Sequence, residues 1–140
     1  MIAKVGERLD SLNDLIPQLK RSEEVGAILV FIGVVRGRSA KGERVLRLEY
    51  EHHPTLAVKA LRDLLEEVKR KHGLIDAIAE HRVGKVGVGE DALYVLVASR
   101  HRLEGLKALE EIVEGIKSRV PIWKREVTEG GSYWVRGGKT

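Results

Sequence analysis

The residues best suited to chemistry lie in the segment KSRVPIWK, which covers residues 117–124. Lys117 falls near the end of a predicted helix and Lys124 follows the break at Pro121, so the two ammonium groups can converge. A lysine that is desolvated near another cation has a lowered pKa and can act as a general acid, a general base or a nucleophile. The structural alternative, which spacing alone favours, is that Lys117 complements a helix dipole and Lys124 is solvated on a strand.

Basic side chains also stand at two predicted strand ends. Arg100, His101 and Arg102 lie where a predicted strand ends and a predicted helix begins. Helix N termini with an adjacent arginine bind phosphate. Arg36 and Arg38 follow an apolar run and can close over the same anion. The alternatives are a solvated strand end, with the histidine bonded to a backbone carbonyl, and a solvated basic loop. The first alternative is as well supported as the phosphate site, and the second is somewhat favoured.

The net charge of +4 is concentrated at the C-terminal end of the chain. Acidic and basic residues balance over residues 1–116, whereas lysine and arginine outnumber glutamate over residues 117–140. Such a local positive potential fits a phosphate-bearing small molecule, a carboxylate or nucleic acid. Phe31, Trp123 and Trp134 are too few and too scattered along the sequence to form stacking platforms for bases, which argues against nucleic acid.

The chain contains no cysteine, which excludes disulfides, thiolate metal sites and a cysteine nucleophile. Any sulfur chemistry must therefore use sulfur that is brought from elsewhere. His52, His53 and His81 do not follow a metal-binding pattern, and we expect neither a metal nor a cofactor. Residues 1–8 lack the long apolar stretch of a signal peptide or membrane helix, so we expect no membrane partner and a cytoplasmic location.

Hydrophobic periodicity predicts one α+β domain over residues 1–140, with a mixed sheet and about three helices. The nearly continuous apolar run 27–35 predicts a buried central strand, followed by a basic loop. Asp10 is placed to cap the first helix, Pro17 shortens it, and the glycines of 84–91 predict a turn. The predicted strands are 2–6, 27–35, 45–51, 75–83, 92–98, 122–127 and 132–135, and the predicted helices are 9–19, 54–73 and about 103–120.

Several short motifs occur together in a fixed order. They are FxGxVR at 31–36, EHxP at 51–54, HRVG followed by GE within 81–90, HR at 101–102 and KSRVPIWKRE at 117–126. In this combination the sequence resembles the family of molybdopterin synthase large, catalytic subunits. The resemblance runs from about residue 26 to residue 135, and the lysine-containing motif is its most specific part.

The resemblance implies an α/β-hammerhead-like fold and a homodimer within a heterotetramer, with a small ubiquitin-like subunit bound at each end. The Gly-Gly tail of that small subunit carries a thiocarboxylate. Its sulfur passes in two rounds to cyclic pyranopterin monophosphate and forms the dithiolene of molybdopterin, in the biosynthesis of the molybdenum cofactor. The expected partners are therefore a sulfur-carrier protein and a pterin phosphate, with no nucleic acid and no membrane.

Carried over residue by residue, the resemblance implies that Lys117 and Lys124 are the catalytic lysines, which transfer protons and activate the acceptor carbon or the thiocarboxylate. Arg36, His101 and Arg102 match anion-binding residues that would hold the substrate's phosphate. The correspondence of Arg136 to this group is looser, because glycines follow it.

The sequence departs from the family pattern at two places. His53 stands where an aromatic residue is common, and the chain stops at Thr140 without the longer tail of some members.

Two other functions are kept as alternatives. One is a non-catalytic basic module that binds RNA or another polyanion, and the other is a scaffold that keeps the fold and the partner without catalysis.

Overall fold

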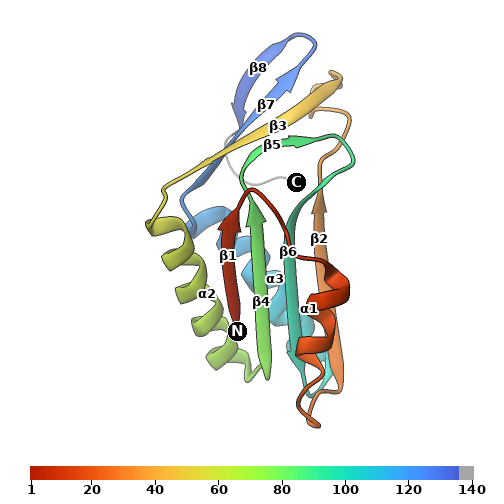
Figure 1. The fold of residues 1–140 in the computed structure, drawn as a ribbon, viewed down its shortest axis with the longest axis vertical. Helices are drawn as coiled ribbons and strands as arrows, with labels where there is room; N and C mark the ends of the chain where they lie inside the picture. The colour runs from red at the N-terminus through yellow and green to blue at the C-terminus, as the bar shows by residue number, and fades with distance from the viewer. Residues whose placement is uncertain (136–140) are drawn as a thin grey trace.

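The computed structural model describes residues 1–135, which form two four-stranded sheets and three helices (Figure 1). In chain order the elements are β1 (Ile2–Gly6), α1 (Leu12–Leu19), β2 (Ala27–Val34), β3 (Val45–His52), α2 (Leu56–His72), β4 (Asp76–Arg82), β5 (Gly84–Gly87), β6 (Asp91–Ser99), α3 (Arg102–Arg119), β7 (Ile122–Thr128) and β8 (Gly131–Val135).

The first sheet has the strand order β1-β4-β6-β2 and is mixed, because β1 runs parallel to β4 whereas the other neighbours are antiparallel. Helices α2 and α3 pack on one face, where Leu61 and Ile112 join Val95 in the largest buried cluster. Helix α1 packs on the opposite face, where Leu15 contacts a second cluster around Leu96. The sheet is therefore covered by helices on both faces, as Figure 1 shows.

The second sheet has the order β5-β3-β7-β8, is antiparallel throughout and lies beyond one end of the first sheet (Figure 1). One of its faces is anchored by a third apolar cluster that contains Val45, Leu48 and Val86. This arrangement confirms the predicted α+β class with three helices and a mixed sheet. Each helix in the described part of the chain is too short or too polar to cross a membrane.

Strand β2 was predicted as a central strand and is an edge strand, so that prediction is wrong. Its side chains alternate, with Leu29 and Phe31 packed against the core, whereas Val30, Ile32 and Val34 are 37%, 39% and 43% exposed. A continuous apolar run cannot by itself distinguish a strand buried on both faces from an edge strand that keeps apolar residues for a partner.

Two local predictions also need correction. Helix α1 is capped by Ser11, whose Oγ accepts a hydrogen bond from the Asn13 N–H at 3.2 Å, and not by Asp10. The predicted turn 84–91 contains strand β5, because Val86 is buried and the strand pairs with β3. A strand of four residues, two of them glycine, shows too little alternation of apolar and polar side chains to be recognised from the sequence.

Gly26 fixes the junction between β2 and the end of β6, and we predict that Gly26→Ala destabilises the fold. The Gly26 N–H donates to the Ser99 carbonyl at 2.9 Å, and a Cβ there would collide with the Arg100 carbonyl oxygen. Because a backbone atom must move, the loss in free energy of unfolding should be about 1–3 kcal/mol by urea titration. Gly37→Ala, whose Cβ would only touch Val88 at 3.4 Å, is the matched control and should change stability little.

Candidate active site

The chain reverses direction between the two lysines. Helix α3 carries Lys117 in its last turn, half-buried, and ends before Pro121, where the Val120 N–H still donates to the Ile116 carbonyl. Val120 has an extended backbone and is buried, which anchors the reversal. Strand β7 then begins at Ile122, so Lys124 returns beside the helix end. The predicted convergence of the two lysines rests on this helix–proline–strand turn.

Lys124 projects from the inner face of the second sheet, the face that also carries Leu48 and Tyr50, and it lies opposite Tyr50 in the β3–β7 pairing. Burial lowers the pKa of Lys124 below its usual 10.5, and the positive charges of Lys117 and Arg36 lower it further, whereas Glu126 opposes the shift. The structural alternative of a fully solvated Lys124 is therefore wrong. A lysine whose pKa is lowered supplies more neutral amine for proton transfer or nucleophilic attack.

His81 and Tyr50 extend this inner face, and the sequence interpretation assigned neither of them to the site. Their rings meet edge to face with centroids 5.0 Å apart. Burial lowers the pKa of His81 to about 4, and the charges of Lys124 and His52 act in the same direction, against the hydrogen bond to Arg82. Since a carbonyl only accepts, His81 Nδ1 must donate to the Arg82 carbonyl at 2.7 Å, which leaves the neutral ring with Nε2 unprotonated.

Burial also raises the pKa of Tyr50 to about 12, so its hydroxyl stays protonated at neutral pH. The inner face thus presents a neutral histidine, a neutral tyrosine and a lysine with lowered pKa side by side. The HRVG motif includes His81, but only the contact of its ring with Tyr50 reveals that it lies in the site. Among residues 1–135, no three histidine, aspartate or glutamate side chains are grouped to hold a metal ion.

His101 and Arg102 lie at the opposite end of helix α3 from Lys117. The helix has 18 residues, so at about 1.5 Å per residue its ends are about 27 Å apart. His101 caps the helix, its backbone N–H donates to Glu104 at 2.8 Å, and its ring is exposed. The structure therefore brings Arg36, Lys117 and Lys124 together within one chain but not His101 and Arg102. Arg136 lies outside the described residues.

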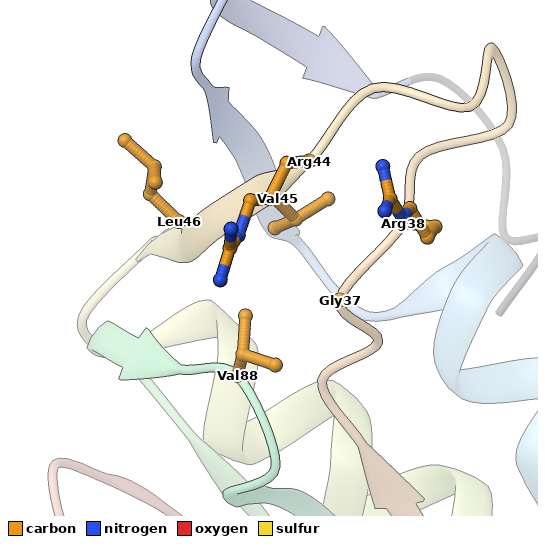
Figure 2. Close-up of a pocket in the computed structure, with 6 residues that line it drawn as sticks. All are labelled: Gly37, Arg38, Arg44, Val45, Leu46 and Val88. Atoms are coloured by element: carbon orange, nitrogen blue, oxygen red, sulfur yellow. The ribbon is translucent and has the colours of Figure 1, made fainter.

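The basic loop after β2 borders an open cavity of about 540 Å³ (Figure 2). Arg38 and Arg44 project from its two walls, and Leu46 and Val88 give it an apolar side. Arg38 also donates to the Gly42 carbonyl at 3.3 Å, which holds the loop closed on itself. Arg36 precedes this loop and is exposed, and its positive charge helps to lower the pKa of Lys124.

Comparison with known proteins identifies the relatives of this chain. The profile of the family described as MoaE protein matches residues 7–119. The molybdopterin synthase catalytic subunit of Pyrococcus abyssi is 38% identical over 119 residues, which are 85% of this chain and 80% of that protein. The subunit of the same name from Thermoplasma volcanium is 42% identical over 119 residues, which are 85% of each chain.

Solved structures give the same result. The crystal structure of molybdopterin synthase from Staphylococcus aureus superposes with a TM-score of 0.86 at 33% identity and covers 95% of this chain and 96% of that one. A complex of subunits 1 and 2 of the molybdopterin-converting factor from Helicobacter pylori, at 21% identity and a TM-score of 0.73, shares the fold. The motifs, the family match and these relatives agree, and the chain belongs to the MoaE family of molybdopterin synthase catalytic subunits.

Proposed function

We propose that this chain transfers sulfur from the C-terminal thiocarboxylate of a small ubiquitin-like protein to cyclic pyranopterin monophosphate, and so forms the dithiolene of molybdopterin. The observation that carries the proposal is the half-buried Lys124, whose pKa is lowered by burial and by the charges of Lys117 and Arg36. This site combines proton transfer with a concentrated positive charge. Both are needed when an anionic donor and an anionic acceptor must meet.

Within this proposal the residues have separate tasks. Arg36 binds the substrate's phosphate and holds it against the lysines, since a guanidinium makes strong charge-assisted hydrogen bonds to phosphate oxygens. Lys117 and Lys124 exchange protons with the reacting groups and stabilise negative charge as the thiocarboxylate gives up its sulfur. His81 and Tyr50, both neutral, shape the wall behind Lys124 and keep water from its amine.

The proposal includes a homodimer formed through the free edge of β2. Val30, Ile32 and Val34 expose apolar surface along this edge strand, which is the usual signature of a partner strand. If two copies pair antiparallel across a two-fold axis, the start of one β2 lies beside the end of the other.

This pairing would complete the anion site. Arg36 follows the end of β2, whereas His101 and Arg102 lie near its start, because Gly26 bonds to Ser99 at that end. Across the two-fold axis, the His101 and Arg102 of the second copy would approach Arg36 of the first. The two groups of residues that are separated within one chain would then serve one pocket.

The direct test is reconstitution. The chain is mixed with a thiocarboxylated small subunit and cyclic pyranopterin monophosphate, and molybdopterin is measured. Product formation would establish the enzyme. The alternative of a polyanion-binding module instead predicts affinity for RNA that collapses as salt rises, because such affinity depends on released counterions.

We predict that Lys124→Arg lowers turnover by about 10²–10⁴-fold, because arginine keeps the positive charge but does not release its proton in the accessible pH range. In the unmodified chain a neutral amine is more abundant at higher pH, so turnover should rise with pH and level off below 10.5, the usual lysine pKa. The variant should lose this rise. Lys107→Arg, an exposed lysine on α3, is the control and should retain the full profile. An unchanged profile in Lys124→Arg would contradict the assignment.

A further inference from the structure

The basic loop after β2 is a short hairpin that sets two arginines directly opposite each other. Arg38 and Arg44 face each other in an isolated antiparallel bridge. The residues next to the two arginines are joined by backbone hydrogen bonds of 2.8 and 3.0 Å, one on each side of the bridge. The arginines are therefore a non-hydrogen-bonded pair, in which the Cα atoms lie about 4.5 Å apart and both side chains project to the same side.

Two positive charges in this arrangement are unfavourable, and the neighbouring carboxylates do little to offset them. Like charges directly opposite each other destabilise an antiparallel pair. Glu43 projects from the other face of the hairpin, where its carboxylate accepts a hydrogen bond from the Thr128 hydroxyl at 3.1 Å. Glu129 approaches Arg44 only to 4.0 Å, and the two side chains are 63% and 69% exposed. An anion bound between the guanidiniums would remove the repulsion.

The hairpin is attached to the second sheet, so the two arginines stand on a fixed frame. The ammonium group of Lys41, near the tip of the hairpin, lies 5.4 Å from the centre of the Tyr133 ring on β8. Val45, which follows Arg44, is buried in the third apolar cluster. Donors that are already ordered lose little conformational freedom when a ligand binds.

The cavity beside the hairpin has the size and the lining of a site for a small anion (Figure 2). Its volume of about 540 Å³ falls within the range of about 300–1,000 Å³ that is usual for small-molecule sites. Leu46 and Val88 give it an apolar side and are 47% and 45% exposed. Guanidinium groups match the oxygens of a phosphate, and exposed aliphatic side chains suit a flat apolar group. Among residues 1–135, the lining consists of Gly37, Arg38, Arg44, Val45, Leu46 and Val88, without a carboxylate.

This cavity differs from the lysine site in its residues. Within the part of the chain that the structure describes, its lining shares no residue with the group of Arg36, Lys117 and Lys124. The chain bends at Gly37, between Arg36 and Arg38. Arg36 acts on Lys124 through its charge, whereas Arg38 lines the cavity. The structure thus gives the two arginines of this segment different surroundings.

We infer that Arg38 and Arg44 form a second anion-binding site, which takes a small phosphate ester with a flat apolar body. The phosphate lies between the two guanidiniums and offsets their repulsion, and the apolar body packs on Leu46 and Val88. The inference concerns binding alone, so it goes beyond the sulfur-transfer reaction and does not depend on it.

The test uses phenyl phosphate as the probe in an NMR titration of the full-length chain at constant ionic strength. The amide signals of Gly37 and Val88 report on the cavity and should shift until they saturate. The Kd should be at least about threefold lower than that of inorganic phosphate, because the ring adds apolar contact. Phenol, which lacks the phosphate, should give no saturable shift. Arg38→Gln and Arg44→Gln should each raise the Kd about tenfold through loss of charge-assisted hydrogen bonds.

Arg62→Gln, which removes an exposed arginine from α2, is the matched control and should keep the original Kd. Thermal melting supplies a second readout. Without the probe, Arg44→Gln should melt at least as high as the original chain, because it removes the repulsion from Arg38. Saturating phenyl phosphate should raise the melting temperature of the original chain and of Arg62→Gln, and should leave that of Arg44→Gln unchanged.

Equal Kd values for phenyl phosphate in the original chain and in both hairpin variants would overturn the inference, as would the absence of saturable shifts in the original chain. Equal Kd values for phenyl phosphate and inorganic phosphate would overturn the assigned class of ligand. Turnover then separates this site from the lysine site, because Arg44→Gln should keep the KM for cyclic pyranopterin monophosphate within about twofold. A larger rise would refute a second site and leave the proposed function intact. If the original chain makes no molybdopterin but binds phenyl phosphate as expected, the proposed function fails and this inference stands.

Discussion

Lys117→Ala is expected to abolish molybdopterin formation while the chain remains folded. The side chain is half-buried in the last turn of α3, and its positive charge helps to lower the pKa of Lys124. Its removal deletes one proton-transfer group and also returns the Lys124 pKa toward its usual value, so the two effects reinforce each other. General acid or base groups contribute about 10²–10⁴-fold to the rate, and the variant should lose at least that much.

Stability should change little, because a partly exposed lysine contributes less than about 1 kcal/mol to the free energy of unfolding. Thermal melting by circular dichroism checks that the fold persists. Lys107→Ala, which removes an exposed lysine from the same helix, is the control and should keep full turnover. Equal product from Lys117→Ala and the original chain would refute the catalytic assignment and would favour a scaffold that positions other groups.

The sequence was most informative where structure is local. Helices α2 and α3 and most strands follow from hydrophobic periodicity and from Gly73 and Pro121 at helix ends. The convergence of Lys117 and Lys124 was also predictable, because a helix end, a proline and a strand within eight residues leave the chain few conformations. The charge excess over residues 117–140 pointed to the same segment before any fold was known.

What the sequence could not reveal depends on pairing between distant segments. The edge position of β2 depends on which strands pair with β6, and the same apolar run would suit either position. Tyr50 and His81 meet only because β3 and β4 bring residues from two sheets together. Trp123 and Trp134 become neighbours through the β7–β8 register, and a shift of one residue would place them on opposite faces.

The separation of Arg102 from Lys117 by the length of α3 gives the second strong prediction, an intersubunit complementation. Lys117→Ala and Arg102→Ala should each be nearly inactive at low substrate concentration, the first through lost chemistry and the second through lost phosphate binding. If the second copy supplies Arg102, a heterodimer of the two variants contains one pocket with both defects and one pocket with none. Co-expression with two different affinity tags isolates that heterodimer, which should recover about half the activity of the original dimer.

The control that gives this result its meaning is a heterodimer of Lys117→Ala with Lys124→Ala. Both lysines belong to the same chain's site, because Lys117 acts on the pKa of Lys124 within one chain, so every pocket of that heterodimer keeps a defect. It should stay inactive. Recovery by the Arg102 pair but not by the lysine pair would show that α3 of one copy reaches the pocket of the other. Failure of both pairs to recover would refute the intersubunit pocket. The 18-residue span of α3 would then exclude Arg102 from the lysine site.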